Sequence, residues 1–263
     1  MSDLKGTYAI VTGASAGIGK HICNQLLTDF PGLSVIGLSR RVISDITISN
    51  FTWMKCDVSD INQIEQAFKQ IKKEFPNKNC SILINNAGHA KPVPLLADPK
   101  LLDIGCLKTD AIQASEAFAS MLSVNVLGLA NCTRVFTQLM DNSFAGNIIN
   151  INSMSGHRVA NSCGTHFYSC TKHAVTALTE GVRQELRTLD SNIRIGAISP
   201  GFVETEFFVA MNAEDADFQE KMKGICDYAL QSEDIYAAVR LMVTADARCQ
   251  IGDVQIRPTK QNT

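Results

Sequence analysis

The chain has 263 residues, of which 45% are hydrophobic, and its formal net charge is −2 at pH 7. This length suits one large α/β domain, so we expect a single domain over residues 1–263. The balanced charge indicates no nucleic-acid surface, and no apolar run reaches the about 18 residues of a membrane span. Nine irregularly spaced cysteines, without a signal peptide or zinc-type CxxC pairs, favour free thiols and a cytoplasmic location.

Strand-like apolar runs alternate with helix-length periodic segments along the chain. Strands are expected at Tyr8–Thr12, Leu33–Ser39, Phe51–Cys56, Ser81–Asn85, Asn147–Asn152, Ile193–Ser199 and near Ile251–Ile256. Helices are expected at about Gly17–Asp29, between Asp60 and Pro76, and at about Met121–Met140, Thr165–Leu189 and Ser232–Ala245. Several strands are apolar throughout, as in parallel sheets covered on both faces. The pattern predicts a Rossmann-like, doubly wound α/β fold with a seven-stranded, mainly parallel sheet.

Two connections have unusual lengths for such a fold. The residues between Arg41 and the third strand leave little room for a helix. The segment between Gly88 and Asn125 is long, and its three prolines predict an irregular start followed by a helix that leads towards Asn125. This long segment either borders a substrate site or lies on the surface.

A glycine-rich turn follows the first strand. It reads TGASAGIGK and contains Gly13, Gly17 and Gly19 before a helix begins. A turn of this kind brings backbone amides and a helix N-terminus to a pyrophosphate. The G-x-x-x-G-x-G spacing differs from the commoner G-x-G-x-x-G, so a flexible turn without a ligand stays open on this motif alone.

The end of the second strand indicates which dinucleotide would bind. NAD-binding proteins carry an acidic residue there for the ribose 2′-hydroxyl, but this chain has Ser39 followed by Arg40 and Arg41. Two guanidinium groups suit a 2′-phosphate, so the sequence predicts NADP(H) rather than NAD(H). A solvated basic turn is the alternative interpretation.

Polar residues follow the next strands as well. Asp57 comes after the third strand, where an adenine would lie, and the NNAG segment Asn85–Gly88 follows the fourth. Because the carboxyl ends of parallel strands meet at one edge of the sheet, Ser153 after the fifth strand should lie near them. Tyr168 and Lys172 then follow at i and i+4 on one helix face.

These motifs together resemble the short-chain dehydrogenase/reductase superfamily over essentially the whole chain. The resemblance rests on TGASAGIG, CDV, NNAG, the Asn125 segment, INSMSG, YSCTK and SPGFVET, in that order. Within the superfamily, INSMSGHRV, THFYSCTK and GDVQIRPT are similar to insect farnesol dehydrogenases and to vertebrate hydroxysteroid and carbonyl reductases. That subgroup prefers NADP(H), and the resemblance also implies a homodimer or homotetramer.

The resemblance implies a catalytic tetrad of Asn125, Ser153, Tyr168 and Lys172, with Ser155 as the rival serine. It implies cofactor contacts from Gly13, Ala14, Ser15, Ala16, Gly17, Ile18, Gly19, Arg40, Arg41, Asp57, Val58, Asn85, Asn86, Ala87, Gly88, Tyr168, Lys172, Pro200, Gly201, Val203 and Thr205. We expect Lys172 and an oxidised nicotinamide to lower the pKa of Tyr168 so that the phenol acts as the general acid/base. No metal site is predicted, because no HExxH motif or carboxylate cluster occurs.

A substrate lid is expected at about residues 202–228. Phe207, Phe208 and Met211 would either line an apolar pocket or pack as ordinary core residues, and both interpretations stay open. His157, His166 and His173 raise the alternative of a Ser–His hydrolase, but the G-x-S-x-G elbow does not occur. His89 is expected to be a hydrogen-bonded loop residue.

The sequence therefore predicts an NADP(H)-dependent alcohol dehydrogenase or carbonyl reductase for a small hydrophobic substrate. A farnesol-like isoprenoid alcohol ranks first, and steroids or small dicarbonyls come next. A non-catalytic NADP(H)-binding regulator on the same fold is the alternative, and a purely structural protein would leave the glycine turn and the arginine pair unexplained.

Overall fold

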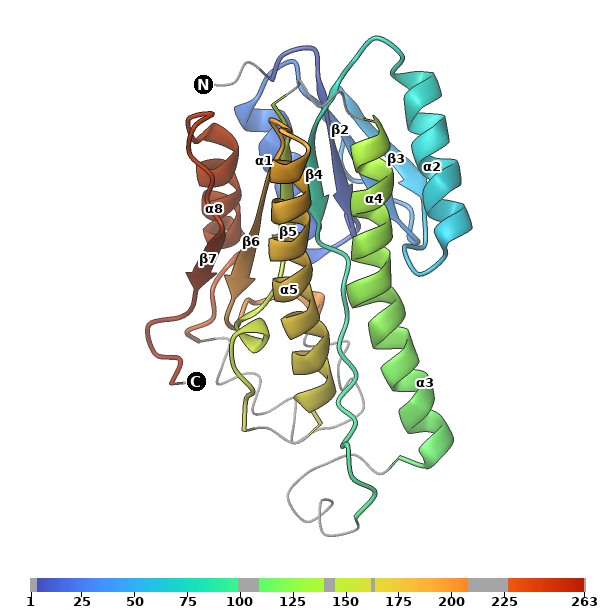
Figure 1. The fold of residues 1–263 in the computed structure, drawn as a ribbon, viewed down its shortest axis with the longest axis vertical. Helices are drawn as coiled ribbons and strands as arrows, with labels where there is room; N and C mark the ends of the chain where they lie inside the picture. The colour runs from blue at the N-terminus through green and yellow to red at the C-terminus, as the bar shows by residue number, and fades with distance from the viewer. Residues whose placement is uncertain (1–3, 99–108, 140–144, 162–163, 208–226, 263) are drawn as a thin grey trace.

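A computed structural model describes residues 4–98, 109–139, 145–161, 164–207 and 227–262 (Figure 1). Its centre is one seven-stranded sheet in the order β3-β2-β1-β4-β5-β6-β7. The strands are β1 Tyr8–Thr12, β2 Ser34–Ser39, β3 Phe51–Lys55, β4 Cys80–Asn85, β5 Asn147–Ile151, β6 Arg194–Pro200 and β7 Asp253–Ile256. All six strand pairings are parallel, which confirms the predicted fold class and makes the sheet wholly parallel.

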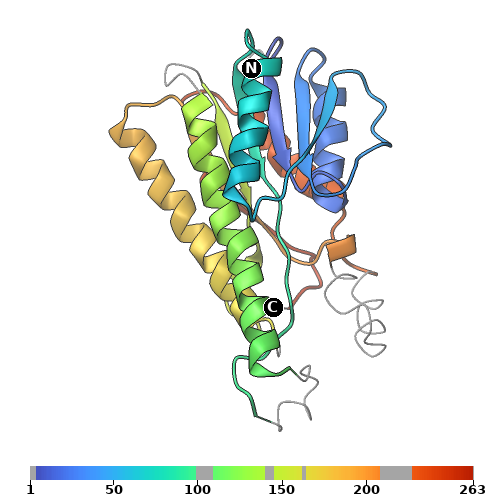
Figure 2. The ribbon, with the colours of Figure 1, turned by 90° about the vertical axis from the view of Figure 1, so that its right-hand side faces the viewer.

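Helices cover both faces of the sheet (Figure 2). On one face, α1 (Gly17–Asp29) and α8 (Ser232–Thr244) pack with the sheet in one buried apolar cluster. On the other face, α2 (Ile61–Glu74), α4 (Leu129–Leu139) and α5 (His166–Thr188) form a second cluster. Burial on both sides explains why β1, β2, β4 and β5 read as continuous apolar runs with few alternating polar residues.

The strand order reverses direction between β1 and β4, which lie side by side although β2 and β3 intervene in the sequence. In open α/β sheets, the crevice for a ligand lies outside the carboxyl ends of the strands at such a switch point. Here those ends carry the glycine turn after Thr12 and the NNAG segment after Ile84. The topology therefore brings two of the predicted motifs together.

The predicted helix at about Met121–Met140 is the second part of a longer helical rod. The structure has α3 (Ala111–Leu122), a π-helical turn η2 (Ser123–Gly128) and then α4 in one continuous rod. Its start is set by a capping box in which Asp110 and Gln113 satisfy each other's backbone N–H groups. α3 is the helix that was predicted to lead towards Asn125, although its first residue was not predicted from the sequence. Met140 lies outside the described residues.

The two connections with unusual lengths agree with the predictions where the structure describes them. Residues 42–50 join β2 to β3 without a helix, and this connection is tied to α1 by an ion pair between Asp45 and Lys20. Residues 89–98 are irregular, as the prolines indicate. In the described part of the chain, no helix is both long and apolar enough to cross a membrane.

Candidate active site at the carboxyl edge of the sheet

The glycine turn is held against the NNAG segment by backbone geometry. Gly13 has a φ of +65°, and a Cβ at this position would lie 2.9 Å from the Cα atom of Ala87. Only glycine takes this conformation without strain and leaves the space open. Asn86 fixes the turn from the other side, because its Nδ2 donates to the carbonyl oxygens of Thr12 at 3.0 Å and Gly13 at 3.2 Å. The turn is therefore shaped before any ligand arrives.

The N-terminus of α1 is left without a protein cap. Ala16 precedes the helix in an extended conformation and offers no side-chain hydrogen bond, and the first turn contains no acidic residue. The first backbone N–H groups of a helix have no partner within it and carry partial positive charge. This end of α1 therefore has the donors and the charge that suit a phosphate.

The other predicted residues of this loop have mixed surroundings. Ala14 is fully buried, and Ile18, in the first turn of α1, packs against the buried apolar cluster. Ser15 accepts a hydrogen bond from Arg41 Nε at 3.3 Å. Val58 packs against the π-helical turn η2, since its carbonyl oxygen would lie 2.7 Å from a Cβ at Gly128. Ser15 is thus the residue that connects the loop to the arginine pair.

The two arginines project from the end of β2 and are mostly exposed. Arg40 Nη1 lies 3.9 Å from Asp57 Oδ2, while Asp57 Oδ1 also accepts hydrogen bonds from the backbone and hydroxyl of Ser59. Arg41 contacts Ser15 and forms a 3.0 Å ion pair with Glu206. The positive charge predicted from sequence is therefore next to the glycine turn, although each guanidinium has an acidic neighbour.

Ser153 and Tyr168 meet on the chemical side of the site. Ser153 follows β5 and begins the 3-10 turn η3 (Met154–Gly156), where its Oγ accepts the backbone N–H of Ser155 at 3.1 Å. Burial raises the pKa of the Tyr168 phenol above its ordinary value, and a hydrogen bond with Ser153 partly opposes this effect. The hydroxyl pairing favours Ser153 over Ser155. The raised pKa differs from the lowered pKa expected from sequence, because burial outweighs the other influences in the protein alone.

Gly156 explains how Ser153 comes so close to α5. A Cβ at Gly156 would lie 2.8 Å from the carbonyl oxygen of Lys172 and 2.6 Å from Nδ2 of Asn152. Any side chain would push η3 away from α5. The SMSG sequence therefore sets the distance between the serine and the tyrosine.

Lys172 is buried one turn after Tyr168. Its Nζ donates to the carbonyl oxygen of Ile151 at 2.8 Å and lies 5.8 Å from the centre of the Tyr168 ring. Burial disfavours the charged ammonium and lowers the pKa of Lys172 to about 8. An ammonium has three donors, so this group can hold other oxygens while it contacts Ile151.

Asn125 lies in the π-helical turn η2 and is buried. Its Oδ1 accepts the backbone N–H of His89 at 2.9 Å, and its Nδ2 donates to the His89 carbonyl at 2.9 Å and to Thr171 Oγ1 at 3.1 Å. Gly88 lies between Asn125 and Lys172. π-Turns occur frequently at functional sites. Here the turn directs the amide to the loop after NNAG rather than along the helix.

The segment after β6 closes the remaining side. Gly201 N donates to Ile256 O at 2.7 Å, Val203 forms a bridge with Leu230, and the Thr205 side chain lies next to Gly17. Pro200 is the last residue of β6. Of the predicted residues Pro200, Gly201, Val203 and Thr205, Thr205 therefore lies against the glycine turn, from which it is more than 180 residues away in the sequence.

Within the predicted lid, Phe207 is a described residue that lies next to Tyr168. Its ring centre is 5.9 Å from that of Tyr168. Phe208 and Met211 lie outside the described residues, as does most of the range 202–228. Phe207 thus supplies an apolar surface beside the phenol.

Sequence reasoning missed several threonines that organise the site. Thr12 Oγ1 accepts the backbone N–H groups of Asn86 and Ala87, both at 3.0 Å. Asn85 points inward, where its Nδ2 donates to Thr133 Oγ1 and Asn150 Oδ1, both at 2.9 Å. Its side chain is thus engaged inside the protein. Thr12 could have been noted from its place directly before Gly13, but the partners of Asn85 are 48 and 65 residues away.

The histidines do not form a hydrolase triad. His157 Nε2 lies 2.9 Å from Ser199 Oγ and 3.0 Å from Asp253 Oδ2, so both partners are on the same ring nitrogen. A relay would need the serine and the carboxylate on opposite nitrogens. His89 is hydrogen-bonded through its ring to Ser120, as expected for a loop residue.

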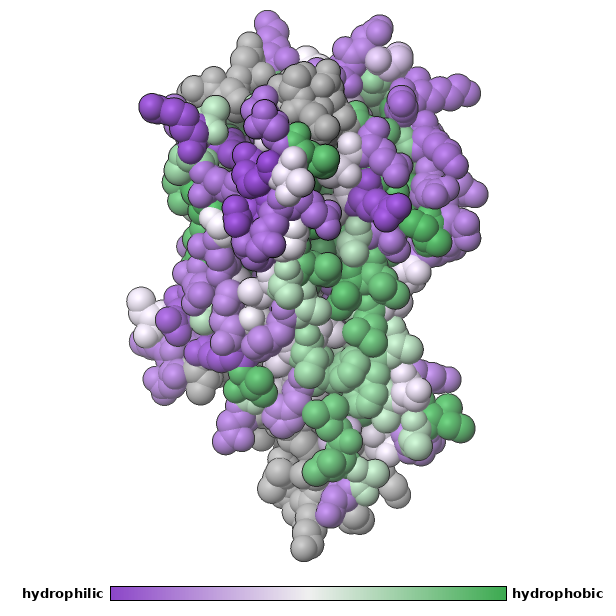
Figure 3. Space-filling view, in the orientation of Figure 1, coloured by the Kyte–Doolittle hydropathy of each residue, from purple (hydrophilic) through white to green (hydrophobic). Residues whose placement is uncertain are grey.

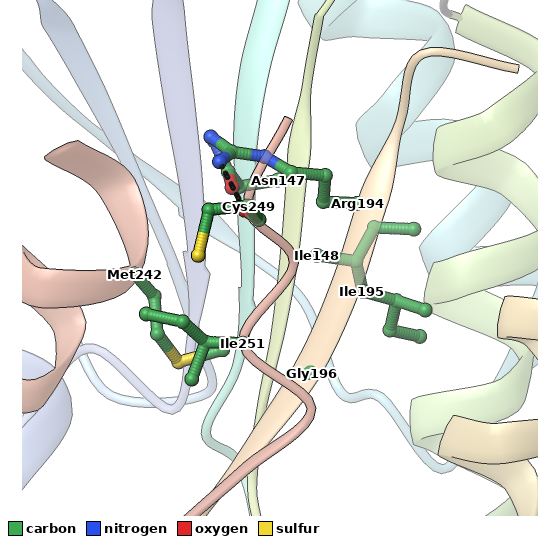
Figure 4. A pocket seen from close by; sticks show the side chains of 8 residues that line it. All are labelled: Asn147, Ile148, Arg194, Ile195, Gly196, Met242, Cys249 and Ile251. Atoms are coloured by element: carbon green, nitrogen blue, oxygen red, sulfur yellow. Dashed lines mark hydrogen bonds between the residues drawn. The ribbon is translucent and has the colours of Figure 1, made fainter. Parts of the chain in front are cut away.

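A shallow pocket lies at the opposite, amino edge of the sheet (Figure 4). It is lined by Asn147, Ile148, Arg194, Ile195, Gly196, Met242, Cys249 and Ile251. The guanidinium of Arg194 donates to the carbonyl oxygens of Ala245, Asp246 and Cys249. These hydrogen bonds hold the chain after α8, so the charged group of this pocket has a structural role.

The carboxyl edge fits a dinucleotide on its own geometry. Gly13 lets the glycine turn pack directly against Ala87, the N-terminus of α1 has no side-chain cap, and Lys172 presents a buried ammonium near Tyr168. The chemistry of this donor set matches a pyrophosphate at one end and ribose hydroxyls at the other.

Known proteins show the same combination of sequence and fold. The family model for short chain dehydrogenases matches residues 7–216. Human dehydrogenase/reductase SDR family member 11 is 40% identical over 279 aligned residues, which cover 100% of this chain and 98% of the relative. Farnesol dehydrogenase of Aedes aegypti is 34% identical, with 98% of each chain covered. The closed form of a serine dehydrogenase complexed with NADP⁺ has a TM-score of 0.81 and 27% identity, covering 98% of this chain and 97% of the other. The chain belongs to the short-chain dehydrogenase/reductase family of oxidoreductases.

Proposed function

We propose that this protein is an NADP(H)-dependent oxidoreductase that interconverts an alcohol and a carbonyl on a hydrophobic substrate. The proposal is carried by one observation: Ser153, Tyr168, Lys172 and Asn125 converge beside the NNAG segment at the carboxyl edge of the sheet. Together they supply a proton donor and acceptor, a second hydroxyl, an ammonium and an amide, which are the groups that alcohol–carbonyl interconversion needs. Burying the Lys172 ammonium costs free energy, so an ordinary polar helix face does not explain its position.

The preference for NADP(H) is supported by charge at the end of β2. Arg40 and Arg41 are 75% and 63% exposed, so both can turn towards a 2′-phosphate. No acidic residue follows β2 directly, since the strand ends at Ser39. An Arg40→Asp variant should shift the cofactor preference towards NAD(H), and an unchanged ratio of the two dissociation constants would contradict this assignment.

Tyr168 acts as the general acid/base. In the reducing direction the phenol donates its proton to the carbonyl oxygen, and in the oxidising direction it takes the alcohol proton. Ser153 shares a hydrogen bond with Tyr168, so the two hydroxyls can contact the same substrate oxygen and stabilise its developing charge. The bound nicotinamide supplies or accepts the hydride at the substrate carbon.

Lys172 holds the nicotinamide ribose and places a positive charge next to the phenol. Its contact with Ile151 O fixes the ammonium while its other donors face the site. Asn125 holds the carbonyl oxygen of His89, two residues beyond Ala87, and so fixes the path of the loop beside Lys172. We assign to Asn125 the role of positioning a water that passes protons to Lys172.

A farnesol-like isoprenoid alcohol is the first substrate to test. The Aedes aegypti relative is a farnesol dehydrogenase, and Phe207 places an aromatic surface 5.9 Å from Tyr168. Apolar side chains around a few placed polar groups are typical of a site for such a ligand. A steroid ketone and a small dicarbonyl are the next candidates.

The test is a screen that follows NADPH absorbance with farnesal, a steroid ketone and a dicarbonyl, and NADPH formation with farnesol. Turnover with one of them and its loss in Tyr168→Phe would support the proposal. Tight NADPH binding without turnover on any of the four would instead favour the alternative, a non-catalytic NADP(H)-binding regulator.

A homodimer or homotetramer is part of the proposal. Hydrophobic residues gather on the surface over α3, η2 and α4 (Figure 3), where Ile112, Leu122 and Leu127 are exposed. Exposed apolar patches of this kind mark protein interfaces. Sedimentation of the wild type against a Leu127→Lys variant tests it, since a charge in the interface should shift the protein towards monomer.

A further inference from the structure

Arg41 joins three segments around the predicted 2′-phosphate site through one ion pair and one hydrogen bond. Arg41 Nη2 lies 3.0 Å from Glu206 Oε2, and Arg41 Nε lies 3.3 Å from Ser15 Oγ. Arg41 follows β2, Ser15 belongs to the glycine turn, and Glu206 comes after β6. Arg41 is thus already bound to a carboxylate in the position where it would meet a phosphate.

The neighbours of Glu206 are fixed on both sides. The Thr205 side chain lies against Gly17, and Phe207 packs beside Tyr168. The segment is also attached through Glu204 N, which donates to Leu230 O at 2.8 Å. Glu206 therefore sits near Arg41 because the backbone is held there, and not only because its side chain reaches out.

The two arginines differ in how strongly they are engaged. Arg40 Nη1 is 3.9 Å from Asp57 Oδ2, beyond hydrogen-bond distance, whereas the Arg41–Glu206 contact is a charged hydrogen bond. A 2′-phosphate competes with Glu206 for Nη2 of Arg41, and it is also repelled by this carboxylate while the two remain close.

We propose that Glu206 is a cofactor-specificity residue whose carboxylate competes with the 2′-phosphate of the cofactor for the Arg41 guanidinium. The proposal rests on the NADP(H) function proposed above. Glu206 lowers the affinity for NADP(H) and leaves the affinity for NAD(H) unchanged. It thereby reduces the ratio of the two affinities that Arg40 and Arg41 create. Because both side chains are about two-thirds exposed, the effect is modest and depends on ionic strength.

The experiment measures binding of two cofactor fragments by calorimetry, adenosine 2′,5′-bisphosphate and 5′-AMP. Glu206→Gln should bind the bisphosphate about two- to fivefold more tightly than wild type, with a larger gain at low salt and no change for 5′-AMP. Glu204→Gln is the matched control, since it removes the same charge two residues away from a carboxylate that pairs with Gln231 Nε2 at 2.8 Å. This control should leave both affinities unchanged.

A second pair of variants tests the route through Arg41. In an Arg41→Ala background, the further change Glu206→Gln should give less gain than it gives in the wild type. An equal gain in both backgrounds, an equal gain from Glu204→Gln, or no gain from Glu206→Gln would each overturn the proposal. If wild type binds both fragments equally but Glu206→Gln prefers the bisphosphate, the competition is supported and the NADP(H) preference of the native protein fails. If neither protein prefers the bisphosphate, the competition by Glu206 and the proposed NADP(H) preference are both contradicted.

Discussion

The two ends of the site are built in opposite ways. Around Tyr168, the polar groups are buried or partly buried and hydrogen-bonded within the protein, as with Asn125 on His89 and Lys172 on Ile151. At the end of β2, Arg40 and Arg41 extend into solvent and have carboxylate neighbours. Buried polar groups with satisfied partners are rigid and strongly coupled, while exposed ion pairs contribute little energy. The chemistry is thus preorganised, and the cofactor preference is left adjustable.

The sharpest test of the rigid end is Tyr168→Phe. Loss of the phenol removes proton transfer to the substrate oxygen, so turnover should fall by about 10²–10⁴-fold. The ring and its packing beside Phe207 remain, so NADPH binding by fluorescence should stay near the wild-type value. Turnover close to wild type in a folded, NADPH-binding variant would exclude Tyr168 as the acid/base.

The choice between the two serines is tested next. Ser153→Ala removes the hydroxyl that is hydrogen-bonded to Tyr168, and kcat should drop by about 10²-fold or more. Ser155→Ala is the matched control, because Ser155 contributes its backbone N–H to Ser153 and that group is retained. Equal losses in steady-state assays of the two variants would show that the pairing does not select Ser153.

The energetic cost of preorganisation is tested with Lys172→Met. Burial lowers the pKa of this ammonium from 10.5 to about 8, so at neutral pH the folded state holds a charge that it disfavours. After allowance for the lost hydrogen bond to Ile151, the inactive variant should gain about 2 kcal/mol of unfolding free energy at pH 7.

The pH dependence of that gain has a defined sign. Between pH 8 and 10.5 the folded wild type loses its proton before the unfolded chain does, so the unfolded state binds more protons and wild-type stability rises with pH. The advantage of Lys172→Met should therefore shrink over this window in thermal melts. An advantage that stays constant up to pH 10.5 would show that the charge of Lys172 is not its source.

The exposed end should give the smallest effect. Arg41→Ala should weaken NADPH binding by about tenfold at low salt, less at high salt, and leave NADH binding unchanged. Arg248→Ala offers a matched control, since this exposed arginine pairs with Asp246 at the other edge of the sheet. If both variants weaken NADPH binding equally in titrations, the effect comes from total charge and not from a 2′-phosphate contact.

The strands and the parallel sheet were predictable from the sequence because they depend on local pattern, whereas the list of site residues rests on the resemblance and stays a prediction. Continuous apolar runs marked buried strands, and TGASAGIG, NNAG and YSCTK marked three turns or helix faces within short windows. The helix that leads towards Asn125 was also predicted, and its start is set by the Asp110–Gln113 capping box, which the prediction did not use. The π-turn at Asn125 has no local signature and appears only in the folded chain.

Tertiary structure decided what the predicted residues do to one another. Burial, which depends on the whole chain, raises the pKa of Tyr168 in the protein alone, whereas Lys172 together with an oxidised nicotinamide had been expected to lower it. The inward turn of Asn85 depends on Thr133 and Asn150, and the pairing of Arg41 depends on Glu206, 165 residues away. Sequence patterns report the residue types and the periodicity of single elements. Distances between elements and the exclusion of water arise only when the sheet brings its carboxyl ends together.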